Sequence, residues 1–133
     1  MKVEGQCHCG QISFEADIDL DKVNICHCTD CQILTGSAYR VTAHAPAASF
    51  VLRSGTPKIY IKTAESGSER AQGFCGNCGT AIYSAAPRDP PTYMLRVGTL
   101  KQRSQLQPSR QIWSRSAQPW AKDLRHVQEI ERQ

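Results

Sequence analysis

The chain has 133 residues, of which 40% are hydrophobic and only 7% aromatic, and its formal charge is +4 at pH 7. This length fits one domain with a thin core, and no stretch approaches the roughly 18 apolar residues of a membrane span. The first ten residues, MKVEGQCHCG, contain no apolar run typical of a signal peptide. We therefore expect one cytoplasmic domain over residues 1–133 that has no membrane partner.

Short apolar runs separated by glycine and proline predict a mostly-β domain. The run at 12–18, ISFEADI, alternates apolar and polar residues, as a half-buried strand does. We expect it to form a hairpin with the preceding run at 3–10, with cysteines at the turn. Five further runs of this kind lie at 37–44, 49–55, 58–63, 79–86 and 92–100.

Helical signals are few. Residues 28–36, CTDCQILTG, predict one helical turn, whereas residues 63–70, TAESGSER, are typical of a mobile loop. In the tail at 120–133, apolar residues recur three positions apart, which fits either a short amphipathic helix or a frayed end.

The seven cysteines are the strongest chemical signal. An odd number of closely spaced cysteines in a chain expected to be cytoplasmic favours metal binding over disulfides. Cys7 and Cys9 are two apart, so on an extended chain their sulfurs point to the same side and His8 points away. Cys75 and Cys78 lie in CGNCG, a turn in which both sulfurs can face one metal. Together these four cysteines would close a tetrahedral structural zinc site.

The remaining three, Cys26, Cys28 and Cys31, leave a fourth coordination position for water or substrate, as in a catalytic zinc site. Two alternatives stay open at this point. His27 or a distant residue could complete the site, or the two C-x-x-C pairs could share one metal. Because metal-bound thiols are deprotonated, two zinc sites would lower the formal charge from +4 to about +1. We therefore expect no nucleic-acid partner.

The motifs C-x-C, C-x-C-x-x-C followed by Gly36, and C-G-x-C-G resemble those of the glutathione-dependent formaldehyde-activating enzyme family, which includes relatives of centromere protein V. The segment PSRQIWSRSAQPW resembles the family's C-terminal signature at five positions: Pro108, Ile112, Trp113, Pro119 and Trp120. The likeness covers about residues 3–120, the expected core. It implies a zinc-stapled β-tent of antiparallel sheets.

The resemblance also implies two Zn²⁺ sites and their ligands: Cys7, Cys9, Cys75 and Cys78 for a structural zinc, and Cys26, Cys28 and Cys31 for a catalytic zinc. It implies a carbon–sulfur lyase or synthase that joins an aldehyde, formaldehyde in the family, to glutathione or another small thiol. The product in the family is S-hydroxymethylglutathione. Gln111 stands where relatives often carry histidine and Gln32 where a basic residue is frequent, so a different substrate is compatible with the sequence.

Three thiolates on Zn²⁺ give a net charge of about −1, which favours carbonyl polarisation or thiol exchange over zinc-hydroxide hydrolysis. His27 is a candidate general acid–base group beside this site. Anionic glutathione would need cationic partners, and the candidates are Arg40, Arg70, Arg96, Arg103, Arg110 and Arg115. We expect Trp113 and Trp120 to be packing residues rather than substrate platforms. The competing hypothesis is a zinc-stabilised binding module without catalysis, which a fourth protein ligand at the three-cysteine site would favour.

Overall fold

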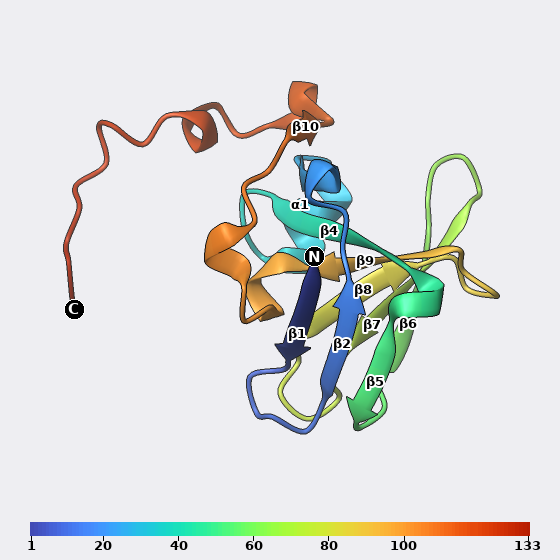
Figure 1. Cartoon of the computed structure of the whole chain (residues 1–133). Helices are drawn as coiled ribbons and strands as arrows, with labels where there is room; N and C mark the ends of the chain where they lie inside the picture. Colours follow the sequence, from blue (N-terminus) through green and yellow to red (C-terminus); the bar gives the residue numbers. More distant parts are fainter.

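A computed structural model describes all residues, 1–133, and shows two sheets (Figure 1). The smaller sheet has three antiparallel strands in the order β1-β2-β5: β1 (Lys2–Gln6), β2 (Ser13–Asp17) and β5 (Val51–Ser54). The expected hairpin of the first two runs is confirmed, since β1 pairs directly with β2.

The larger sheet has seven strands in the order β10-β3-β4-β9-β8-β7-β6. Its strands are β3 (Val23–Cys26), β4 (Arg40–Pro46), β6 (Lys58–Thr63), β7 (Glu69–Phe74), β8 (Ala81–Ala85), β9 (Thr92–Arg96) and β10 (Arg110–Ile112). All neighbours pair antiparallel except β10, which runs parallel to β3. The predicted mostly-β class is confirmed.

One α-helix, α1 (Thr29–Thr35), follows β3 directly. It begins at Cys28, whose sulfur accepts a hydrogen bond from the Cys31 N–H, and it ends at Gly36 with φ 61°. Glycine adopts this left-handed conformation at little cost, so it stops the helix. Six short 3₁₀ helices complete the structure: Leu20–Lys22, Ala47–Ser49, Val97–Thr99, Arg103–Gln105, Ser114–Ser116 and Pro119–Lys122.

The two faces of the larger sheet differ in chemistry. On one face the cross-strand neighbours Val23, Ala43, Leu95 and Tyr83 belong to the apolar core, which also includes Phe14 of the smaller sheet. Because side chains alternate along a strand, the intervening residues point to the opposite face. That face buries polar side chains, and they are Asn24, Arg40, Thr42, Gln72, Ser84 and Arg96.

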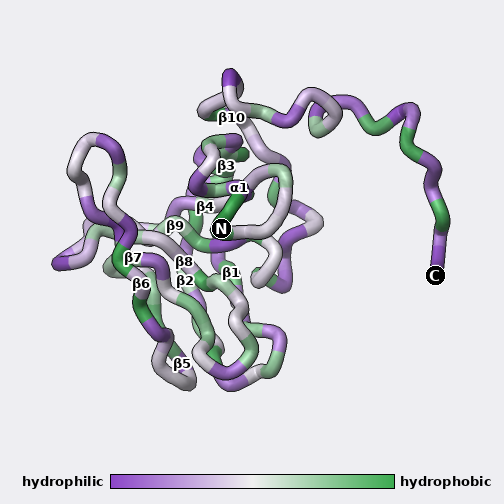
Figure 2. Tube along the Cα trace, turned by 180° about the vertical axis from the view of Figure 1, so that it is seen from behind, coloured by the Kyte–Doolittle hydropathy of each residue, from purple (hydrophilic) through white to green (hydrophobic).

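Two expectations for irregular segments need correction. Glu69 and Arg70, assigned to a loop, begin strand β7, which the sequence pattern did not indicate. The tail forms no helix after Lys122 and extends away from the body, so the amphipathic-helix alternative is wrong (Figures 1 and 2). None of the helices combines the length and apolar character needed to span a bilayer.

Candidate metal centres and substrate cavity

The sulfurs of Cys7, Cys9, Cys75 and Cys78 form one compact group, all within 4.8 Å of one another. The Cys7–Cys9 sulfur distance is 3.5 Å and the Cys9–Cys75 distance is 3.8 Å. Four sulfurs at 2.3 Å from a tetrahedral zinc would lie about 3.8 Å apart. The spacing therefore fits a metal ion of this kind.

Two turns supply this four-cysteine group. Cys7 and Cys9 follow β1, and Cys75 and Cys78 lie between β7 and β8. The Ile12 N–H donates to the Cys7 sulfur at 3.2 Å, a contact that stabilises a thiolate. His8 is exposed and its ring does not belong to the group, as its place between two inward-pointing cysteines predicted.

The second group contains the sulfurs of Cys26, Cys28 and Cys31, again within 4.8 Å of one another. These residues end β3, cap α1 and lie in its first turn. The Cys31 thiol hydrogen bond lowers the pKa of Cys26 to about 5, and the nearby Arg40 charge acts in the same direction. The same bond, with burial, raises the pKa of Cys31.

No histidine, aspartate or glutamate joins the three-cysteine group. His27 is 1% exposed and its Nε2 lies 2.7 Å from Gln111 Oε1, while its ring meets Tyr39 edge-on. The two C-x-x-C pairs fall into separate groups, so the structure does not support the alternative in which they share a metal. The roles of the seven cysteines as zinc ligands, and of His27 as an acid–base group, stay predictions.

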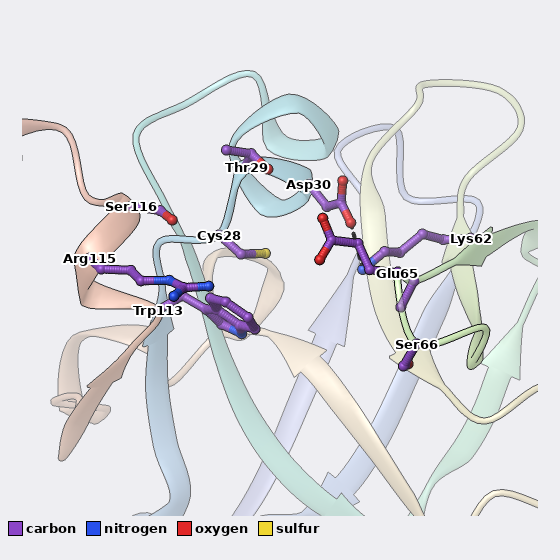
Figure 3. Close-up of a pocket in the computed structure, with 10 residues that line it drawn as sticks. Cys28, Thr29, Asp30, Lys62, Glu65, Ser66, Trp113, Arg115 and Ser116 are labelled. Carbon is purple, nitrogen blue, oxygen red and sulfur yellow. Dashed lines mark ion pairs between the residues drawn. The ribbon is translucent and has the colours of Figure 1, made fainter.

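Cys28 lines a cavity of about 410 Å³ (Figure 3). Trp113 forms one wall, and the Arg115 guanidinium lies over its indole ring, 5.0 Å from the centroid. Asp30 and Lys62 face each other across another side in an ion pair of 2.9 Å. The remaining lining residues are Thr29, Ala64, Glu65, Ser66 and Ser116. The walls of the cavity thus contain one sulfur of the three-cysteine group, an aromatic ring, and side chains of both charges.

Residues 2–116 match the family model described as glutathione-dependent formaldehyde-activating enzyme. The chain belongs to this family. It is 30% identical over 98 residues to an uncharacterized lyase of Schizosaccharomyces pombe, which covers 74% of this chain and 68% of the yeast protein. A crystal structure of a Rhodobacter sphaeroides protein shares the fold with a TM-score of 0.62 and 18% identity, covering 81% of this chain and 98% of that one.

Gln32 and Gln111, the two glutamines at which we expected a departure from the family pattern, both bond within the chain. Gln32 donates to the carbonyl oxygens of His27 and Ser116, at 2.7 and 3.0 Å, and accepts from Gln118 at 2.7 Å. Gln111 bonds the His27 ring. These contacts hold the segment 110–118, which carries Trp113 and Arg115, against the residues between β3 and α1 that contain the three cysteines.

The six arginines proposed as substrate partners are not equivalent in this family member. Only Arg115 lines the Cys28 cavity, while Arg40 and Arg96 are buried on the polar face of the larger sheet. The others lie elsewhere: Arg70 in β7, Arg103 in a 3₁₀ helix and Arg110 in β10, where it donates to Asn24.

Both tryptophans are more exposed than expected for packing residues, Trp113 at 51% and Trp120 at 58%, and Trp113 lines the cavity. Lys62 and Glu65 line the cavity although sequence reasoning did not single them out. The sequence gives no sign that the end of β6 and the loop that follows it lie close to Cys28.

Proposed function

We propose that the chain is a zinc-dependent carbon–sulfur lyase or synthase that joins an aldehyde, such as formaldehyde, to glutathione or a similar small thiol. Family membership and the lyase name of the yeast relative support this class of reaction. The observation that carries the proposal is the open group of three sulfurs, one of which, that of Cys28, lines a cavity large enough for a small ligand.

In this proposal Cys26, Cys28 and Cys31 hold one Zn²⁺, and the four-cysteine group holds a structural one. When bound, the first ion would supply a Lewis acid that can polarise a carbonyl oxygen or accept a substrate thiolate in its fourth position. Three thiolates on a divalent ion leave about one negative charge, and Arg40 lies close enough to offset it.

The remaining cavity residues suit an anionic, flexible thiol. Arg115, which forms no ion pair, offers positive charge for a glutathione carboxylate, and the exposed Trp113 ring offers an apolar surface for its backbone. In the synthetic direction a carbon–sulfur bond forms, the carbonyl π bond breaks, and the thiol proton ends on the new hydroxyl. Asp30 is paired with Lys62, whereas Glu65 forms no ion pair, so Glu65 is the carboxylate free to carry that proton.

The test is an exchange measurement with ¹³C-formaldehyde and glutathione on zinc-loaded protein, followed by NMR. Because the two compounds combine without an enzyme, the rate without protein is subtracted. We expect interconversion with S-hydroxymethylglutathione to exceed the background, and Cys28→Ser to remove the excess while lowering the melting temperature only slightly. Glu65→Gln should reduce the excess without changing thiol binding.

An absence of excess rate with a panel of small thiols and aldehydes, in protein that carries two zinc ions, would contradict the proposal. Thiol binding without turnover would then favour the zinc-stabilised binding module.

A further inference from the structure

A buried polar row crosses the larger sheet and is not explained by the Cys28 cavity. Gln72 of β7 lies opposite Ser84 of β8, and Arg96 of β9 lies opposite Thr42 of β4. Arg40 follows on the same face of β4, two residues from Thr42, and pairs in register with Cys26. Each member of this row is less than 10% exposed. Burying so many polar groups is costly unless something bonds them.

The two arginines of this row have no acidic partner. Arg96 donates to Gln72 Oε1 at 2.8 Å and more weakly to the Ser84 hydroxyl, both neutral acceptors. Neither arginine takes part in the six ion pairs of the chain, and the buried Nε of each has no hydrogen-bond partner. Burial, and then repulsion from Arg40, lowers the pKa of Arg96 to about 9. Arg40 therefore has only the cysteine group as a nearby negative charge, and the side-chain acceptors of Arg96 are neutral.

Both guanidinium groups border hollow space. A cavity of about 330 Å³ is lined by Arg40, Arg96 and Gln72 together with Leu34 of α1 and Tyr60 of β6. A second hollow of about 320 Å³ shares the two arginines and Leu34. Both arginines thus line space that can hold a small ligand group, while their Nε atoms are themselves buried.

This second cavity lies near the Cys28 cavity, because residues of α1 and β6 line both. Asp30 and Lys62 mark the first cavity, and Leu34 and Tyr60 mark the second. The steps from Asp30 to Leu34 on a helix and from Lys62 to Tyr60 on a strand are each about 6 Å. Both pairs keep the same helix and strand face, so neighbouring positions of the same two elements line the two cavities.

We propose that Arg40 and Arg96 form a carboxylate-binding subsite for the substrate whose thiol meets the three-cysteine group. The inference rests on the proposed function and deepens it by assigning the substrate class: a thiol that carries a carboxylate several bonds from its sulfur. A planar carboxylate matches the fork of donors that a guanidinium presents, and it supplies the acceptor charge that the polar row lacks.

The test uses calorimetry on zinc-loaded protein with three probes that separate sulfur from carboxylate. S-methylglutathione keeps both carboxylates but has no free thiol, N-acetylcysteamine is a neutral thiol, and the diester of glutathione has a thiol with masked carboxylates. Arg40→Gln and Arg96→Gln are compared with Arg88→Gln, an exposed arginine in the loop after β8. Arg96→Lys is included as a variant that keeps the charge.

We expect each Gln variant to weaken S-methylglutathione binding at least tenfold and N-acetylcysteamine binding less than twofold, while Arg88→Gln changes neither. The diester should bind like N-acetylcysteamine, and Arg96→Lys should recover part of the lost affinity. Equal weakening of the neutral thiol would overturn the subsite, because the arginines would then act only through the charge of the cysteine group.

The failure of the proposed function gives a different pattern. Loss of N-acetylcysteamine binding to the wild-type protein, with arginine-dependent binding of S-methylglutathione intact, would reject the zinc–thiol step and keep the subsite. A wild-type protein that does not bind S-methylglutathione would reject the subsite. Melting curves of all variants identify any that fails to fold, and Arg96→Lys then decides the outcome at that position.

Discussion

At the scale of single residues, losing one sulfur should affect stability differently in the two cysteine groups, because only one group links distant parts of the chain. Cys75 belongs to the group that joins the turn after β1 to the turn between β7 and β8. Cys28 belongs to a group spanning six residues, and it also caps α1, a position where serine serves equally well.

We predict that Cys75→Ser unfolds the protein, because structural zinc supplies on the order of 10 kcal/mol of binding free energy coupled to folding. Cys28→Ser should lower the melting temperature only slightly. Thermal melts of both variants, with zinc content measured beforehand, check this. Equal destabilisation would contradict the separate roles of the two groups.

A second residue-scale prediction concerns His44 of β4. The Asn24 amide nitrogen lies 3.0 Å from His44 Nε2 and donates to it, so the ring is neutral. Burial, aided by the charge of Arg110, lowers the pKa of His44 below its ordinary value of 6.5. Its contribution to stability is therefore complete above pH 6.5 and falls as the pH drops below that value, where the unfolded state takes up the proton first.

An NMR titration of the His44 ring should give a midpoint below 6.5. The variant His44→Gln should show less loss of unfolding free energy between pH 7 and pH 5.5 than the wild type. A midpoint at or above 6.5 would contradict the buried neutral ring.

At the scale of elements, the segment 110–118 forms a wall of the cavity because side chains hold it there. β10 pairs with β3, and Gln32 bonds Ser116 and Gln118. We predict that Gln32→Ala costs about 1–2 kcal/mol of stability and raises hydrogen exchange in this segment, since partly buried acceptors lose their donor. The matched control is Gln102→Ala, which removes an exposed bond to Glu4. Equal hydrogen exchange in the segment 110–118 of both variants would show that the pairing of β10 with β3 is enough to hold this segment in place.

The sequence predicted those elements whose pattern is local. Alternation in ISFEADI and the compact run KIYIKT predicted β2 and β6. The cysteine spacing favoured a division into four and three, and the structure groups the sulfurs in the same way although Cys7 and Cys78 lie far apart along the chain. Strands β3, β7 and β10 were missed, since their short or polar sequences are held by neighbouring strands.

The residues that line the cavity could not be predicted from the sequence for a related reason. Trp113, Arg115 and Lys62 come from segments far apart in sequence, and only the pairing of β10 with β3 and the position of β6 bring them to Cys28.

At the scale of the whole molecule, the body is complete without the tail. Leu124, Val127 and Ile130 are 58%, 57% and 72% exposed, so they add nothing to the core. We predict that removing residues 124–133 leaves the melting temperature and thiol affinity unchanged within error. A drop of several degrees in a thermal melt would show that the tail covers part of the body in solution.

The account rests on one claim about the whole molecule, that one zinc is closed by four cysteines and the other keeps a position for a substrate sulfur. Zinc X-ray absorption spectroscopy of fully loaded protein measures the mean number of sulfur ligands directly. We predict about 3.5 sulfurs per zinc in the free protein and about 4 after saturation with glutathione. In Cys28→Ser the addition of glutathione should not raise the number of sulfurs per zinc. A value of about 4 before the thiol is added, or no rise after it, would contradict the open site.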